Sequence, residues 1–73
     1  MELSPKKKML GFALKGRGVG RDATLNILLL LDLDDELDDM SWFMGQHPEA
    51  TEDQLVAVAL QLDKESREKG LKR

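Results

Sequence analysis

The segment covering residues 25–31 constrains the fold most, because six of its seven residues are apolar. Leucine dominates this segment and valine is absent from it, which favours a helix over a buried strand. A helix that is apolar on nearly every side must be surrounded by other elements. Asp22 is the expected N-cap, since its carboxylate can accept from a free backbone N–H. Residues 22–31 are therefore predicted to form the central helix of the fold.

Cap and turn signals place another helix before this segment. Ser4 followed by Pro5 is typical of a helix start, because the serine oxygen can cap the helix and proline is tolerated at its first position. The glycines of residues 16–20 end this helix, so it is expected to cover residues 5–15. Its expected apolar stripe comprises Met9, Leu10, Ala13 and Leu14, with Phe12 on the flank.

The C-terminal helix carries the strongest local signals. Thr51 and Gln54 have the spacing of a capping box, acidic residues fill the first turn, and basic residues gather near the end. Gly70 then favours termination, so a helix is predicted over residues 52–69, with residues 71–73 frayed. Its expected buried stripe comprises Leu55, Val58, Ala59 and Leu62.

The segment between these helices allows two interpretations. Its apolar residues recur at helical spacing, as in one unbroken helix over residues 22–44. Such a helix would be about 35 Å long, which is awkward in so small a protein. Asp32 and Asp34 are also good N-caps. We therefore favour a break near residues 32–34 and a separate third helix over residues 34–44, closed by Gly45.

These elements predict an all-α fold, a compact bundle of three or four short helices in a single domain spanning residues 1–73. The core of so short a chain supplies only about 3–5 kcal/mol of net stability. The chain has no cysteine, so a partner or self-association is the expected reinforcement. The lack of cysteine also favours a cytoplasmic location for the protein. Neither a signal peptide nor a membrane span is expected, because the apolar runs are too short.

Charge is strongly segregated along the sequence. Residues 1–21 hold six Lys or Arg and one acid, residues 22–63 hold eleven acids and no Lys or Arg, and residues 64–73 hold five basic residues and two acids. The simplest expectation is that the basic ends fold back on the acidic middle and partly neutralise it. The alternative is that the acidic middle faces a basic partner.

Direct nucleic-acid binding is a third interpretation of this charge pattern. Its candidate phosphate contacts are Lys6, Lys7, Lys8, Lys15, Arg17 and Arg21. The third helix, which would be the natural recognition element, is strongly acidic and would be repelled by a phosphate backbone. Nucleic acid is therefore an unlikely partner.

The sequence lacks the residues or the space that metal binding, phosphate binding and catalysis would need. A calcium loop beginning at Asp32 would need glycine and glutamate where the chain has Leu37 and Phe43. His47 stands alone without cysteine, which argues against a zinc site. The glycines of residues 16–20 lack the Gly-Lys-Ser/Thr of a phosphate loop. Catalysis would also need a pocket that so short a chain has little room to form. No enzyme activity, cofactor or metal is expected.

Trp42 is the strongest candidate for recognition. At 100° per residue it points away from the apolar stripe of the third helix and lies beside acidic residues. An exposed tryptophan is favoured at interfaces because it buries much area with few rotatable bonds. The competing interpretation is that a neighbouring segment covers the ring. The predicted partner-binding residues are Trp42, Phe43, Asp35, Asp38 and Asp39.

The sequence thus predicts a small non-enzymatic protein–protein interaction or regulatory module. Its partner is expected to be a protein, and a basic one if the carboxylates contribute. Self-association through residues 28–31, Trp42 and Phe43 is a further expectation. The alternative function is an acidic inhibitor or nucleic-acid mimic that occupies the basic site of a nucleic-acid-binding protein. A direct DNA or RNA binder using the basic ends ranks third.

Overall fold

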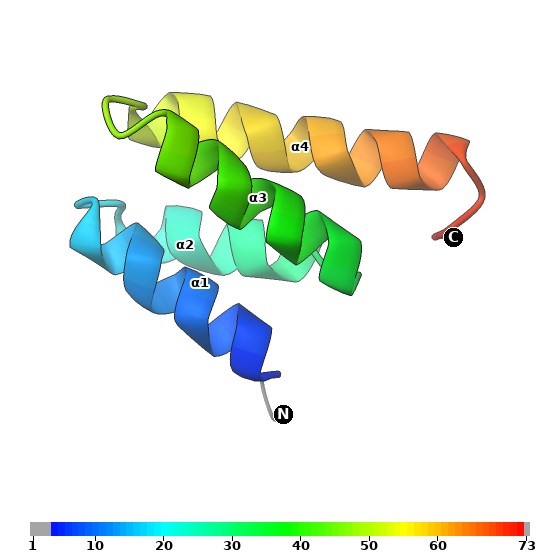
Figure 1. Cartoon of the computed structure of the whole chain (residues 1–73), viewed down its shortest axis with the longest axis horizontal. Helices are drawn as coiled ribbons and strands as arrows, with labels where there is room; N and C mark the ends of the chain where they lie inside the picture. Colours follow the sequence, from blue (N-terminus) through cyan, green and yellow to red (C-terminus); the bar gives the residue numbers. More distant parts are fainter. Residues whose placement is uncertain (1–3, 73) are drawn as a thin grey trace.

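The structure is a computed structural model that describes residues 4–72. It contains four helices: α1 (Pro5–Gly16), α2 (Arg21–Leu30), α3 (Asp34–Gln46) and α4 (Glu52–Glu68). The described residues contain no strand, and the helices pack into a small bundle (Figure 1). The predicted all-α fold is therefore confirmed.

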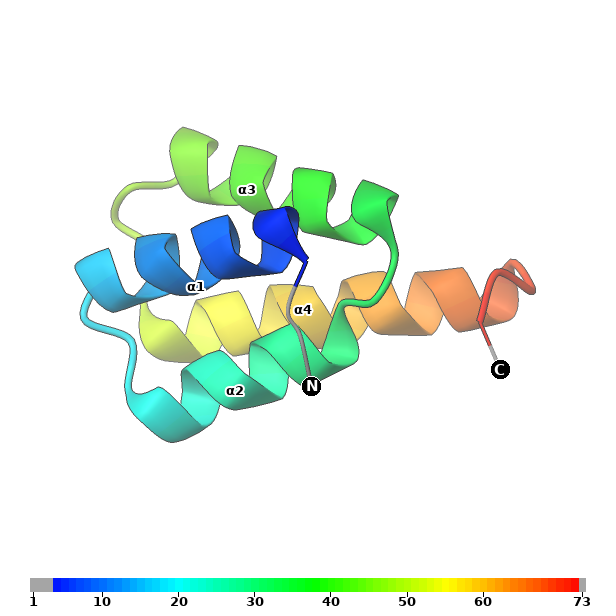
Figure 2. The same ribbon diagram turned by 90° about the horizontal axis from the view of Figure 1, so that it is seen from below.

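The four helices are arranged as a ring. Both α2 and α3 pack against α1 and against α4, whereas in the described part of the chain α1 does not pack on α4, nor α2 on α3. Figure 2 shows α2 and α3 on opposite sides of the bundle. The junction of α1 with α2 therefore lies diagonally across from the junction of α3 with α4. A ring of this kind has no central helix.

The turn between α1 and α2 is built around Gly18, whose φ is +79°. The N–H of Val19 donates to the carbonyl of Leu14 at 3.1 Å, and the N–H of Gly18 donates to that of Lys15 at 3.0 Å. This hydrogen-bond pattern is a Schellman motif, in which glycine adopts the left-handed conformation without a steric penalty. It buries Val19 in the core and carries α1 one residue beyond the predicted end.

The prediction that Asp22 caps α2 is wrong. Gly20 occupies the N-cap, and its backbone N–H donates to the Glu52 carboxylate at 2.6 Å. Asp22 lies in the first helical turn, where its charge still suits the helix dipole. Glu52 reaches Gly20 because α2 and α4 pack side by side, but no side chain of the described residues caps the first turn of α2.

The predicted break between the second and third helices is confirmed. After α2 ends, Leu31 adopts an extended conformation with its side chain fully buried. Neither predicted aspartate caps α3. Instead the Glu36 carboxylate accepts from the N–H groups of Asp32 and Leu33, both at 3.0 Å. The helix also continues through Gly45, the predicted terminator, to Gln46.

Both ends of α4 are tightly defined. The N–H of Gln54 donates to the Thr51 hydroxyl at 3.3 Å, and the N–H of Thr51 donates to the Gln54 side chain at 2.9 Å, which confirms the predicted capping box. A second Schellman motif, with Gly70 at φ +76°, closes the helix. In it the N–H of Leu71 donates to the Ser66 carbonyl at 2.9 Å. The prediction that residues 71–73 are frayed is therefore wrong for Leu71; Arg73 lies outside the described residues.

The Thr51→Ala variant should lower the free energy of unfolding by about 1 kcal/mol, because the Gln54 N–H loses its acceptor. Chemical denaturation measures this difference directly. Thr51→Ser keeps the hydroxyl and is expected to retain most of the stability. An unchanged denaturation midpoint for Thr51→Ala would contradict the cap.

The core contains fewer residues of α1 and α2 than predicted. In α1, Leu10 and Leu14 are buried, whereas Met9 and Ala13 of the predicted stripe are exposed. The predicted α4 stripe is confirmed, with Leu55 and Ala59 buried and the other two members half-buried. The core residues are Leu10, Leu14, Val19, Ile27, Leu28, Leu31, Leu37, Met40, Met44, Leu55 and Ala59.

The expectation that α2 is surrounded on every side is also wrong. Leu25 is 49% exposed and Leu29 is 66% exposed, although both belong to the apolar run. The reason is the ring arrangement, which leaves each helix a face toward solvent. The apolar run therefore contributes both to the core and to the surface.

Candidate functional site

The outer face of α3 carries the predicted recognition residue. Trp42 is 66% exposed, so no neighbouring segment of the described chain covers its ring. The helix directs its buried stripe, Leu37, Met40 and Met44, into the bundle. At 100° per residue, Trp42 projects from the opposite side of the helix. This placement agrees with the angular prediction from the sequence.

Three exposed carboxylates share this outer face. Asp35, Asp38 and Asp39 precede Trp42 by seven, four and three residues, the spacings that bring side chains onto one side of a helix. We call these three residues and Trp42 the α3 outer face. It presents one large apolar ring beside three negative charges.

One of these carboxylates is already paired within the chain. Lys6 Nζ lies 3.1 Å from Asp38 Oδ2, and this hydrogen bond is the main reason that the pKa of Lys6 is raised above 10.5. Lys7 similarly pairs with Asp32 at 3.1 Å. The expectation that the basic N-terminal segment folds back on the acidic middle is thus confirmed, and it reduces the negative charge around Asp38.

The structure does not bring Phe43 together with Trp42. Phe43 is half-buried and packs against the core. Its ring centroid lies 4.5 Å from that of His47, just beyond the end of α3. The adjacent position places Phe43 about 100° around the helix from Trp42, on the side that faces the bundle. Phe43 therefore packs against the bundle and does not belong to the α3 outer face.

The basic residues predicted as phosphate contacts are divided between two settings. Lys6 and Lys7 form the ion pairs described above, and the Arg17 guanidinium donates to the backbone carbonyls of Met44 and His47. Arg17 thereby ties the end of α1 to the end of α3. The remaining candidates, Lys8, Lys15 and Arg21, are exposed.

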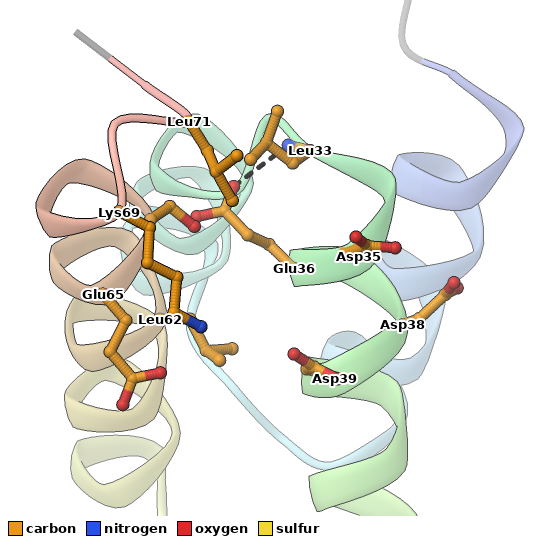
Figure 3. Close-up of a pocket in the computed structure, with 10 residues that line it drawn as sticks. Leu33, Asp35, Glu36, Asp38, Asp39, Leu62, Glu65, Lys69 and Leu71 are labelled. Atoms are coloured by element: carbon orange, nitrogen blue, oxygen red, sulfur yellow. Dashed lines mark hydrogen bonds between the residues drawn. The ribbon is translucent and has the colours of Figure 1, made fainter.

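A shallow pocket opens between α3 and the end of α4 (Figure 3). Its lining includes Asp35 and Asp39 from α3 and Glu65 from α4, with Lys69 as a cation at its edge. In Figure 3, Glu36 reaches toward α4, whereas Asp38 points to the opposite side of α3. On the side of α3 next to this pocket, the Glu36 carboxylate is therefore buried between helices and does not face solvent.

That carboxylate belongs to a buried ionic cluster that the sequence analysis did not predict. Lys72 Nζ lies 2.9 Å from Glu36 Oε2 and 2.7 Å from Asp63 Oδ1, and it also donates to the carbonyl of Leu30. The side chains of Lys72 and Glu36 are 8% and 3% exposed. Lys72 thereby joins the chain after α4 to the end of α2 and to the first turn of α3.

The cluster shifts the pKa values of its members. Burial raises the pKa of Glu36, but hydrogen bonds from the Leu33 backbone, Lys72 and Ser66 outweigh it and lower that pKa below 4.5. Hydrogen bonds from Lys72 and then Arg67 lower the pKa of Asp63 below 3.8. Burial lowers the pKa of Lys72, but the two carboxylates outweigh burial and raise it above 10.5.

These shifts predict how stability depends on pH. The carboxylates stabilise the fold above their ordinary pKa values, and this contribution is lost as pH falls below about 4.5. Lys72 stabilises the fold below about pH 10.5, and this contribution is lost as pH rises through the raised pKa of Lys72. Denaturation at a series of pH values should show the greatest stability between these limits. An acid limb that remains equally steep in Glu36→Gln would contradict the assignment to Glu36.

Comparisons with protein-family models, with characterised proteins and with solved structures find no match to this chain. Among residues 4–72, no helix has both the length and the apolar character needed to cross a membrane. The same residues contain no group of three or more His, Cys, Asp or Glu side chains placed to hold a metal ion.

Proposed function

We propose that this chain is a non-enzymatic protein–protein interaction module that binds a basic partner through the α3 outer face. The observation that carries the proposal is the 66% exposure of Trp42 beside three exposed carboxylates. Tryptophan contributes strongly to interfaces when its ring enters a pocket on the partner. The surrounding carboxylates would set orientation and exclude like-charged partners. The lack of cysteine suits a reducing compartment, so we place this activity in the cytoplasm.

The alternative function, an acidic inhibitor that imitates nucleic acid, relies on the carboxylates rather than on the ring. The pairing of Asp38 with Lys6 weakens that alternative, because it neutralises one of the three charges within the chain. The two functions also differ in their response to salt. Binding anchored by Trp42 should persist as salt rises, whereas binding by an acidic mimic should be lost steeply.

The Trp42→Ala variant tests the proposal. Because the ring lies outside the core, the substitution should change the free energy of unfolding by less than about 0.5 kcal/mol. In the wild-type monomer, tryptophan emission should be red-shifted and quenched readily by acrylamide. Affinity capture from native extract should lose the specific partner of the wild type when Trp42 is replaced.

Leu60→Ala is the matched control, because Leu60 is an exposed apolar residue on α4 rather than α3. This control should capture the same partner as the wild type. Capture of the same partner by Trp42→Ala and the wild type would contradict a role for the α3 outer face. An unfolded Trp42→Ala chain would instead return the indole to the core.

A further inference from the structure

A second surface feature lies at the junction of α1 and α2. A groove runs between these helices, with Gly11, Phe12, Leu25 and Leu28 in its lining. Phe12 is 74% exposed and Leu25 is 49% exposed, so apolar side chains remain accessible there. A Cβ added at Gly11 would lie 3.5 Å from Leu28 Cδ1, an ordinary van der Waals distance, so the Leu28 side chain lies beside Gly11 in the groove. The groove is therefore an apolar hollow rather than a flat surface.

Three cations border this groove. Lys8, Lys15 and Arg21 line it and are exposed, and within residues 4–72 none of them forms an ion pair. Lys7 also lines the groove, but Asp32 already holds its ammonium group. A ligand that fits this surface should combine an apolar side chain with neighbouring negative charges. The cations would otherwise be left beside an apolar surface without counter-charges.

The α3 outer face has this combination. It offers the Trp42 ring together with Asp35 and Asp39, whose carboxylates form no ion pair within residues 4–72, whereas Asp38 is already paired with Lys6. We infer that the groove between α1 and α2 receives the α3 outer face of a second copy of this chain. The inference rests on the proposed function in that it uses the same face, and it names the partner as another copy.

The ring arrangement explains why the contact must form between copies. The α3 helix does not pack on α2, and Trp42 projects away from the bundle, so a chain cannot fill its own groove. The two surfaces also differ from each other, which makes the contact head-to-tail rather than two-fold symmetric. Each copy that docks its α3 outer face still offers an empty groove. Association should therefore continue beyond a dimer as concentration rises.

The experiment uses two variants that each block one surface. Leu25→Glu with Lys15→Glu blocks the groove and leaves Trp42 in place. Trp42→Ala with Asp39→Lys blocks the α3 outer face and leaves a chain without tryptophan, since Trp42 is its sole one. Circular dichroism and thermal denaturation verify that both variants fold. Sedimentation from micromolar to millimolar concentration should show growing assemblies for the wild type and monomers for each variant alone.

The mixture of the two variants gives the decisive result. The intact groove of one variant should receive the intact face of the other, which yields a dimer that cannot extend. Titrating the tryptophan-free variant into the groove-blocked variant should shift the emission of Trp42 to shorter wavelength and protect it from acrylamide. Leu60→Glu, on exposed α4 surface, is the control and should assemble like the wild type.

Several outcomes would overturn the inference. They are a wild type that stays monomeric throughout the concentration range, a mixture that stays monomeric, or variants that assemble as the wild type does. Binding of the monomeric wild type to anionic vesicles or random-sequence duplex DNA, lost on Lys15→Glu, would assign the groove to another ligand. A monomeric wild type that still loses a captured partner on Trp42→Ala would overturn the inference alone and leave the proposed function intact.

Discussion

Replacing Lys72 by methionine is expected to lower the free energy of unfolding by roughly 3 kcal/mol, although Lys72 lies at the end of the described chain. The loss does not measure a strong intrinsic attraction, because a buried ion pair loses much of its Coulombic energy to desolvation. It arises because methionine leaves the Glu36 and Asp63 carboxylates without their shared cation. Chemical denaturation at neutral pH measures the difference.

Lys69→Met is the matched control for this variant. Lys69 is an exposed lysine three residues earlier, so the same change of side chain should alter stability by less than about 0.5 kcal/mol. Equal stability of Lys72→Met and the control would mean that the chain after α4 is frayed, as the sequence analysis predicted. A large loss for both variants would instead point to a general effect of net charge.

The buried cluster could not be predicted from the sequence because it depends on tertiary placement. Lys72 lies 36 residues from Glu36 along the chain, and charge segregation predicts attraction between the two regions without selecting partners. Glu36 also looks like any other member of an acidic run. Only the packing of α3 on α4 distinguishes its buried carboxylate from the exposed carboxylates of Asp35 and Asp38.

Two features that depend on neighbouring residues were predicted well. The Thr51 capping box was correct because both of its hydrogen bonds span three residues. The exposure of Trp42 followed from the helical period, once the stripe through Leu37 and Met40 was known to be buried. The predicted N-cap of α2 was wrong because Gly20 occupies that position, where its N–H is bound by Glu52 from a distant helix.

The apolar run of α2 shows most clearly what the sequence could not decide. It contains residues suited to burial on every side, but the number of neighbouring helices sets how many are buried. The Ile27→Ala variant should lower the free energy of unfolding by about 3 kcal/mol, because Ile27 is fully buried and truncation leaves a cavity. Leu29→Ala should lower it by less than about 0.5 kcal/mol, because that side chain is 66% exposed.

This pair of variants tests the ring arrangement itself. Both substitutions remove a large aliphatic side chain from the same helix, so their effects on helix propensity are similar and the difference reports burial. If α2 were surrounded, as the sequence alone suggested, the two losses measured by chemical denaturation would be alike. The comparison should be made at a protein concentration where sedimentation shows monomers, because an assembly stabilises the folded chain by mass action. Similar losses in the monomer would require a further segment to cover Leu29, and the helices would then not form a ring.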